Sequence, residues 1–448
     1  MTMVTLLAFL VAAPGAVFAV LSLAWLLGMA CREKLVARLT ALLFSVEVIA
    51  AAAIGIHMWK TGQTAVRTPV WHWFQAGSYH FELSLVADHL SWPLLQLTTV
   101  VVGLVGVFSV RYLHRDRGYF RFFLLLHLFA FGALLVLAAG TFDMLLGGWE
   151  LVGISSVLLI AFFDERREPV RNAVRVFGFY RVADLGLLLG IFFLHHFQHT
   201  TESIKLFHGV WPDDAVSMST SAATLVGLLL LVAASGKSAQ APFSAWLPRA
   251  MEGPTPSSAI FYGAISVHLG AYLLLRAEPV FRAAPLAAAA VIAVGAVTAV
   301  LATLVHRAST DAKTSLAYAG MAQLGIIFVE IGLGFPRLAL AHIMGHAVVR
   351  TLQFLRAPSM LHDYHRVHAA AGGHLGRTGS HYDRFLPESA RLWLYRAAVE
   401  RGYQDALLDR LVIGPILSVA AWLDALEPRS GTAESKSTAS RLAERVEG

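Results

Sequence analysis

Long apolar stretches, separated by short polar segments, run through most of the chain. Stretches of about 18 or more apolar residues are long enough to cross a bilayer as helices. The pattern predicts an all-α, polytopic transmembrane helix bundle with helices at 4–30, 35–58, 90–112, 120–139, 142–163, 171–196, 222–251, 256–278, 284–306, 311–333 and 336–357, and a weaker candidate at 407–426. The helix at 222–251 is expected to be interrupted, because Pro242 lacks the backbone donor that a continuous helix needs.

The segments between and after these helices predict smaller elements. Residues 66–87 alternate polar and apolar positions and are rich in aromatics, which indicates a short external hairpin. Residues 358–384 are rich in Gly, Ser, His and Arg and predict an irregular cytoplasmic loop, while 385–405 have the helical spacing of an interfacial amphipathic helix. The polar tail from Glu427 is expected to be disordered.

Composition and charge support a membrane protein. Hydrophobic residues make up 57% of the chain and charged residues only 14%, against roughly 25% charged in soluble domains. The net charge of +6 lies in connecting loops, so it sets topology and does not indicate nucleic-acid binding. Loops after odd-numbered helices are basic, as at Arg32, Arg115 and Arg166, and the positive-inside rule then places the N-terminus outside.

The sequence also excludes several chemistries. The single cysteine, Cys31, rules out a disulfide within the chain or a cysteine-based metal site. The chain carries no phosphate-binding glycine loop, dinucleotide fingerprint or nucleophile elbow. We therefore expect a transporter subunit, not an enzyme, with no metal and no cofactor in this chain.

Two charged residues inside apolar helices are the first candidates for function. A charge at the bilayer centre costs at least ~2.5–3.5 kcal/mol. Glu150 is flanked by apolar residues and glycines, and Lys237 lies beside the expected helix break, where transporters place ion sites. We expect a proton-coupling pair in which the distance between Glu150 and Lys237 sets whether the lysine keeps its proton; the alternatives are a structural ion pair and a lysine that snorkels to the interface.

A second group of candidates lies on later helices. His342, His346 and Arg350 are four apart and form one stripe on a helix face. A proton relay is the main interpretation, and structural hydrogen bonding or a metal site are the alternatives. His268 is placed to link Lys237 to this stripe, and Tyr262 on the same helix is a further candidate.

Other intramembrane charges complete the candidate set. Glu330 and Glu47 are interpreted as entry or exit residues or as contacts with a partner subunit. Arg181 and Asp184 are three apart on one helix and are expected to form a structural ion pair.

Three segments resemble one protein family. They are GWELVGISSVLLIAFF, GKSAQAPFSAWLPRAMEGPTPSSAIFYGAISVHLGAYLL, and DAKTSLAYAGMAQLGIIF followed by HIMGHAVVRTLQFL. They resemble the antiporter-like proton-translocating subunits of respiratory complex I and of Mrp cation/proton antiporters. The likeness implies N-terminal helices and a hairpin at 1–84, a proton-translocation core at 85–357 with an inverted repeat, and a C-terminal part at 358–448.

The resemblance also implies roles for individual residues. Glu150 and Lys237 match the family's coupling pair, and His342 and His346 match its paired histidines. Two positions depart from the pattern. The family's histidine on the eighth helix aligns with Tyr262, so that a histidine appears only at His268. The family's lysine after the two histidines is Arg350, and because arginine does not release its proton we expect a fixed charge there.

The region after the last histidine stripe narrows the resemblance. The chain lacks the family's second broken helix, and RTLQFLRAPSMLHDYH is similar to the DabB subunit of DAB-type inorganic carbon pumps. That similarity implies a large DabA-like, zinc-containing partner that resembles a β-carbonic anhydrase, in a bacterial cell inner membrane, with proton or sodium flow driving CO2 hydration in the partner. The alternatives are a proton-pumping subunit of a complex I-like or Mrp-type assembly, and a passive membrane anchor.

Overall fold

The computed structural model describes residues 2–29, 32–69, 71–76, 79–359 and 386–403, together with positions 410, 415, 418, 419 and 422. The chain forms two compact units, Met1–Gly402 and Tyr403–Gly448, and the architecture below is that of the first unit. The loop predicted at 358–384, the candidate helix at 407–426 and the tail from Glu427 lie wholly or almost wholly outside the described residues.

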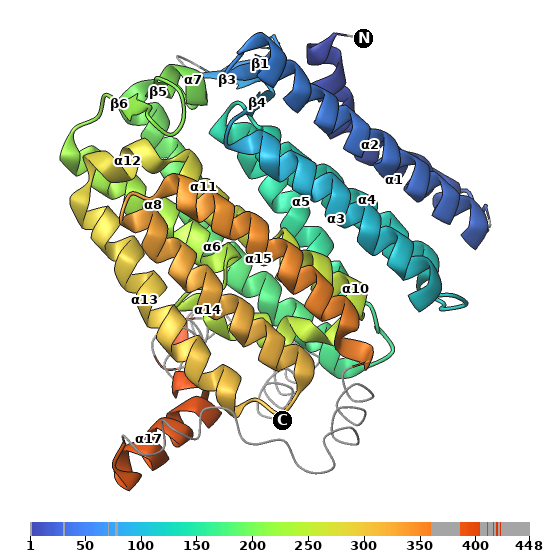
Figure 1. The fold of residues 1–448 in the computed structure, drawn as a ribbon, viewed down its shortest axis with the longest axis vertical. Helices are drawn as coiled ribbons and strands as arrows, with labels where there is room; N and C mark the ends of the chain where they lie inside the picture. Colours follow the sequence, from blue (N-terminus) through green and yellow to red (C-terminus); the bar gives the residue numbers. More distant parts are fainter. Residues whose placement is uncertain are drawn as a thin grey trace, which may run out of the picture. The chain divides into compact units, whose positions relative to one another are not determined.

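The described part of the chain has eleven helical spans long and apolar enough to cross a membrane. They are α1 (Met3–Leu26), α2 (Glu33–Thr61), α3 (Ser91–Tyr112), α4 (Tyr119–Ala138), α5 (Phe142–Ile160), α6 (Arg167–Gln198), α8 (Thr220–Lys237), the span Thr255–Arg276, α13 (Pro285–Ala308), α14 (Ala312–Gly332) and α15 (Pro336–Arg356). The predicted polytopic helix bundle is thus confirmed (Figure 1). The inverted repeat stays a prediction.

The seventh span differs from the predicted helix at 222–251 in its second half. α8 is α-helical only to Lys237, and short turns follow: η1 (Phe243–Ala245), α9 (Trp246–Arg249) and η2 (Ala250–Glu252). The indole nitrogen of Trp246 donates to the carbonyl of Gly236 at 2.8 Å. A carbonyl at the free end of α8 is satisfied in this way, which a helix end buried among other helices requires.

The eighth span is broken where the sequence predicts a continuous helix at 256–278. It consists of α10 (Thr255–Ser257), the π-helical η3 (Ser258–Ala264) and α11 (His268–Arg276), followed by α12 (Glu278–Ala283). The amide of Ile265 donates to the carbonyl of Ile260 at 2.8 Å, five residues back, as in a π-helix. The whole span is buried among other helices, and irregular backbone at membrane depth is tolerated only there.

The spans pack as neighbouring antiparallel helices, with α13 on α14, α4 on α5, α6 on α8 and α2 on α3. Inside a membrane the hydrophobic effect does not hold helices together, so close packing through small residues does. α4 and α5 approach at Gly132 and Gly148, where a Cβ on Gly148 would lie 2.7 Å from the Gly132 carbonyl oxygen.

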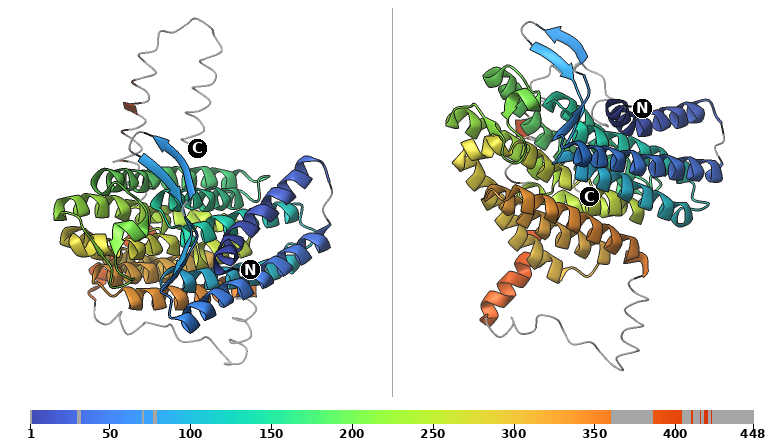
Figure 2. Two further views of the ribbon diagram at one scale, coloured as in Figure 1. Left: turned by 90° about the horizontal axis from the view of Figure 1, so that it is seen from above. Right: turned by 45° about the horizontal axis from the view of Figure 1, so that its top comes forward.

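In the described part of the chain, six short strands lie at one end of the helices, which we call the strand face (Figure 1). β1 (Ala65–Arg67) pairs with β4 (Val86–Asp88), β2 (Trp71–Ala76) with β3 (Tyr79–Leu83), and β5 (Phe207–His208) with β6 (Ala215–Val216), all antiparallel. α7 (Ser203–Leu206) precedes β5. The predicted hairpin at 66–87 is confirmed as two nested strand pairs, and β2 and β3 project beyond the helix ends (Figure 2).

After α15 the chain forms the short turn η4 (Ala357–Ser359) and, beyond the gap in the description, α17 (Glu388–Val399) and η6 (Arg401–Tyr403). The helix predicted at 385–405 is therefore present as α17, which contacts α13. Its place at the membrane interface stays a prediction.

Candidate functional site

A cluster of charges lies between α5 and α6. One guanidinium nitrogen of Arg181 forms ion pairs with both Glu150 and Asp184, the latter at 2.8 Å. The indole of Trp149 donates to the other oxygen of Asp184 at 2.6 Å. The expected contact between Arg181 and Asp184 is present, but the ion-pair partner of Glu150 is Arg181 and not Lys237.

Lys237 lies beside this cluster at the end of α8 and is 2% exposed. Its ammonium donates to the carbonyl of Trp149 at 3.0 Å and lies over two aromatic rings, 4.6 Å from the centroid of Trp149 and 4.9 Å from that of Tyr180. Glu150 and Asp184 attract it electrostatically, although among the described residues no carboxylate oxygen comes within ion-pair distance. The lysine is thus held by its hydrogen bond to Trp149 and by weaker contacts, at ~0.5–2 kcal/mol for each ring.

The end of α8 meets the start of α11 directly. The hydroxyl of Ser238 donates to the carbonyl of Val267 at 2.6 Å, just before His268. Gly270 makes this approach possible, because a Cβ there would clash with the Ala234 carbonyl oxygen. The two breaks, after α8 and before α11, therefore lie side by side and bring Lys237 and His268 to the same part of the bundle.

His268, His346 and Arg350 form a directed chain of hydrogen bonds from α15 to α11. Nδ1 of His268 lies 2.5 Å from the Ala264 carbonyl oxygen and must carry a hydrogen, which leaves Nε2 to accept from Nδ1 of His346 at 2.8 Å. Nε2 of His346 then accepts from Arg350 at 3.2 Å. Both rings are neutral in this arrangement, and the chain of donors runs in one direction, because the Ala264 carbonyl can only accept and Arg350 can only donate.

His342, one turn before His346 on α15, has different partners. Its Nδ1 lies 2.9 Å from a Glu330 oxygen and its Nε2 lies 3.1 Å from the side-chain oxygen of Gln323. Both ring nitrogens of His342 are therefore held, one by each of these side chains. The candidate Glu330 thus belongs with the histidine stripe. Gln323 was missed, although it lies seven residues before Glu330 on the same face of α14.

Tyr262 and two other hydroxyl groups form a smaller cluster next to Lys237. The hydroxyl of Ser156 lies 3.1 Å from that of Tyr262 and 3.4 Å from that of Tyr180. Tyr180 also forms one of the aromatic walls of Lys237. Tyr262 therefore lies on the Lys237 side of the site and not on the histidine side.

Glu47, on α2, lies apart from the residues around Lys237 and the histidine stripe. It is fully buried, and neither carboxylate oxygen has a hydrogen-bond partner. His127 on α4, which sequence reasoning missed, lies on the same side of the bundle and bonds Thr40 at 3.1 Å. A lone histidine inside the apolar run of helix 4 was the signal that could have found it.

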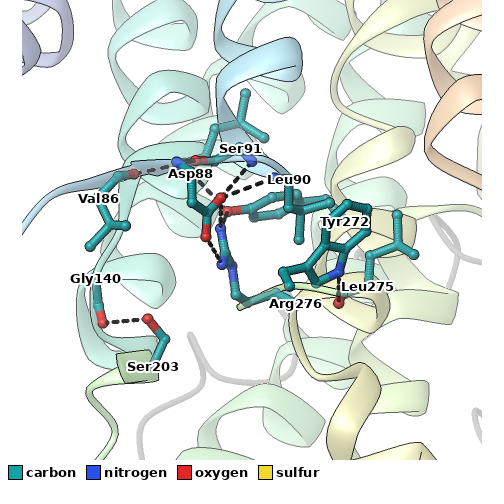
Figure 3. A network of polar contacts seen from close by, with 11 residues as sticks. Val86, Asp88, Leu90, Ser91, Gly140, Ser203, Tyr272, Leu275 and Arg276 are labelled. Carbon is teal, nitrogen blue, oxygen red and sulfur yellow. Dashed lines mark hydrogen bonds and ion pairs between the residues drawn. The ribbon is translucent and has the colours of Figure 1, made fainter. Parts of the chain in front are cut away.

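A second polar network lies at the strand face (Figure 3). Arg276, at the end of α11, pairs with both oxygens of Asp88 at 2.5 and 3.1 Å and donates to the hydroxyl of Tyr272 at 3.1 Å. Burial alone would raise the pKa of Asp88, but the charge of Arg276 and the backbone amide of Ser91 outweigh it and lower the pKa to about 2. A cavity of about 360 Å³ opens beside this network and is lined in part by Arg67, Asp88 and Arg276.

The remaining cavities and clusters add little to the site. A cavity of about 520 Å³ between the α3–α4 and α5–α6 turns is lined by Arg117, Asp164, Arg121 of α4 and five other residues. Over the described ranges, no three His, Cys, Asp or Glu side chains are grouped closely enough to hold a metal ion.

The arrangement as a whole is one row of polar side chains within the spans, of which Lys237, His268 and His346 are buried. It runs from Glu150 and Arg181 through Lys237 to His268, His346 and finally Glu330. Nearly every member gains or loses a proton in ordinary chemistry, and such groups at membrane depth are costly to keep. The tertiary structure thus brings together all the predicted site residues apart from Glu47.

Comparison with known proteins places this row in context. Residues 138–373 match the family described as NADH:quinone oxidoreductase/Mrp antiporter, TM, and residues 73–123 match NADH-ubiquinone oxidoreductase (complex I), chain 5 N-terminus. Curated relatives include the chloroplastic NAD(P)H-quinone oxidoreductase subunit 5 of Piper cenocladum, 33% identical over 74% of this chain and 44% of the relative. NADH-quinone oxidoreductase subunit L of Campylobacter jejuni is 35% identical over 66% of this chain and 48% of the relative. The chain spans less than half the length of these relatives.

Two solved structures of membrane complexes also contain chains that superpose on this one. A chain of the Mrp complex from Dietzia sp. DQ12-45-1b superposes with a TM-score of 0.66 at 28% identity, over 79% of this chain and 37% of that one. A chain of an archaeal membrane-bound sulfane sulfur reductase superposes with a TM-score of 0.63 over 78% of this chain and 70% of that one, and at 18% identity this shows the fold alone.

Proposed function

Because the chain belongs to the membrane-subunit family shared by NADH:quinone oxidoreductases and Mrp antiporters, we propose that it moves protons across a membrane as one subunit of a heteromeric complex. The observation that carries this proposal is the row of proton-exchanging side chains from Glu150 to Glu330, in which Lys237, His268 and His346 are buried. The assemblies named in the comparisons, complex I and an Mrp complex, fit such a role.

Arg181, at the Glu150 end of the row, controls which cation the carboxylates of Glu150 and Asp184 hold. While it holds both Glu150 and Asp184, Lys237 has no carboxylate of its own and passes its proton toward His268. When Arg181 leaves Asp184, that carboxylate faces the now neutral amine of Lys237 and favours a new proton on it. The proton therefore moves because the carboxylates exchange cations, and the broken end of α8 gives Lys237 room to follow.

The exposure of the cluster supports a partner subunit. The side chains of Arg181 and Glu150 are 37% and 27% exposed at the outer side of α5 and α6. Charged groups in contact with lipid at this depth are expensive. A neighbouring membrane subunit that covers this face would remove the cost and would also couple its own motions to Arg181.

Orientation and partner identity are finer parts of the proposal. The basic loops opposite the strand face support placing that face and the N-terminus outside a bacterial inner membrane. The segment after α15 supports a large zinc-containing, carbonic-anhydrase-like partner whose CO2 hydration is driven by ion flow through this chain, which would itself hold no cofactor. The named relatives support a complex I-like or Mrp-type assembly more directly.

Flux measurements test the common proposal. The tagged chain, with whatever subunits remain bound in mild detergent, is reconstituted into liposomes with an internal pH-sensitive dye. Lys237→Met and Glu150→Gln should each lower proton flux at least tenfold, while the surface variants Lys60→Met and Glu165→Gln should leave it within twofold. Normal flux in both site variants would refute proton movement along the row.

Mass spectrometry and zinc analysis of the same preparation separate the two kinds of partner. One large subunit with about one zinc per complex supports the carbon-pump assembly. Several small membrane subunits without that partner support the complex I-like or Mrp-type assembly.

A further inference from the structure

α11 carries three polar side chains on one face, at His268, Tyr272 and Arg276. Their spacing of four residues places them on successive turns. At 1.5 Å per residue the stripe covers about 12 Å, from the histidine pair in the bundle to the cavity at the strand face. The row described above uses only His268, so the other two are unassigned.

A small cavity lies between the first two of these side chains. It measures about 10 Å³ and is lined by His268, Tyr272, Thr98 and seven other residues of α3, α4, η3, α11, α15 and the turn before α11. This volume suits a single water molecule. The hydroxyl of Thr98 is buried and has no hydrogen-bond partner, which is the polar group that such a water would satisfy.

The second and third side chains are joined directly. The hydroxyl of Tyr272 donates to the carbonyl of Leu137 at 2.8 Å and accepts from Arg276 at 3.1 Å. Arg276 in turn pairs with Asp88 at the wall of the larger cavity (Figure 3). Polar groups therefore follow one another from His346 through His268 and, across the small cavity, Tyr272 to the strand face.

We propose that this line is a proton path between the histidine pair and the strand-face cavity, with one water beside Thr98 and with the Asp88–Arg276 ion pair as its closed gate. The proposal rests on the proton movement proposed above and adds its route to one side of the membrane.

The chemistry of the path balances at each step. A proton passed on from Lys237 first reaches Nε2 of His268, and the imidazolium then turns its Nδ1 proton from the Ala264 carbonyl to the water. The water gives a proton to the oxygen of Tyr272, and Tyr272 releases its own hydroxyl proton to water that enters from the larger cavity once Arg276 has moved aside. No charge stays on the tyrosine. In the closed state Arg276 donates to the Tyr272 oxygen and places a permanent positive charge beside it, so that the oxygen cannot take up a proton. Movement of Arg276 away from Tyr272 opens the path.

Flux variants test the route. Thr98→Val and Tyr272→Phe remove one hydroxyl each and should lower proton flux about tenfold in the reconstituted complex. Matched controls are Thr303→Val on an exposed helix face and Tyr119→Phe at the far end of α4, and both should stay within twofold. Full flux in Thr98→Val and Tyr272→Phe, together with loss of flux in Lys237→Met, refutes this route and leaves the proposed function standing. Full flux in Lys237→Met as well refutes the proposed function itself.

Chemical labelling tests the gate without any flux measurement. On a Cys31→Ser background, Thr98→Cys places a thiol in the small cavity, and a water-soluble thiol reagent is added from the strand face. Labelling should be slow while Arg276 is present and at least tenfold faster with Arg276→Gln. Arg276→Lys, which keeps the charge without the two-pronged contact, should label at an intermediate rate and serves if Arg276→Gln does not fold. A purely structural ion pair lowers thermal stability in these variants without changing the labelling rate, and unchanged labelling in the folded variants refutes the gate.

Discussion

Replacing Asp88 by asparagine should lower the free energy of unfolding. Two features of the structure give the size of this loss. The variant leaves Arg276, whose side chain is 8% exposed, without its ion-pair partner, and breaking a buried pair in this way costs ~3–5 kcal/mol. The pKa of Asp88 gives a second figure, since it lies at about 2 instead of the ordinary 3.8. At 1.36 kcal/mol per pKa unit this difference corresponds to about 2 kcal/mol.

The sign of the pH dependence follows from the lowered pKa. The stabilisation is fully present above the unfolded pKa of 3.8 and is lost as the pH falls toward about 2. The native protein is more stable than Asp88→Asn at neutral pH, and this difference in stability should disappear as the pH falls between these two values. A folded-state pKa above the ordinary value would give the opposite trend.

Thermal unfolding in mild detergent, followed by tryptophan fluorescence at pH 7, measures the effect. For a chain of this length, 1 kcal/mol corresponds to about 1 °C, so that Asp88→Asn should lower Tm by about 2–5 °C. Asp213→Asn is the matched control, because Asp213 pairs with Arg337 at 3.4 Å with both side chains at least 75% exposed, and such surface pairs contribute ~0–1 kcal/mol. Equal Tm values for Asp88→Asn and Asp213→Asn would refute the reasoning.

Three further outcomes are expected. Gly270→Val should abolish the folded protein, because the valine side chain has no room against the α8 backbone. The loss is seen as disappearance of the monodisperse peak in gel filtration. Gly345→Val, at a position with open space, should preserve that peak. Trp149→Leu should lower proton flux about tenfold, since the cation–π contact with Lys237 is lost; flux within twofold of the native value would contradict this. Gln323→Leu should cut flux severalfold by removing one acceptor of His342, and Gln323→Glu, which keeps an acceptor, should restore most of it.

The sequence alone determined the elements that depend on local composition. Apolar runs placed all eleven spans, because a bilayer requires about 20 apolar residues for each helix wherever the helix packs. Alternation with aromatics placed the hairpin at 66–87 for the same local reason. Isolated charges within apolar runs identified Glu150, Lys237, Glu330 and the histidine stripe, since such residues stand out against their neighbours without any knowledge of the fold.

The partners of those residues were decided only by the tertiary structure. Glu150 pairs with Arg181 and not with Lys237, because the packing of α5 against α6 places the guanidinium next to the carboxylate. The break between η3 and α11 could not be read from an apolar run, since a π-helical turn and an α-helix have the same composition. Asp88 and Arg276 are 188 residues apart, and no local pattern links them. Local physics thus fixed which segments enter the membrane, whereas the packing of helices distant in sequence decided which charges meet.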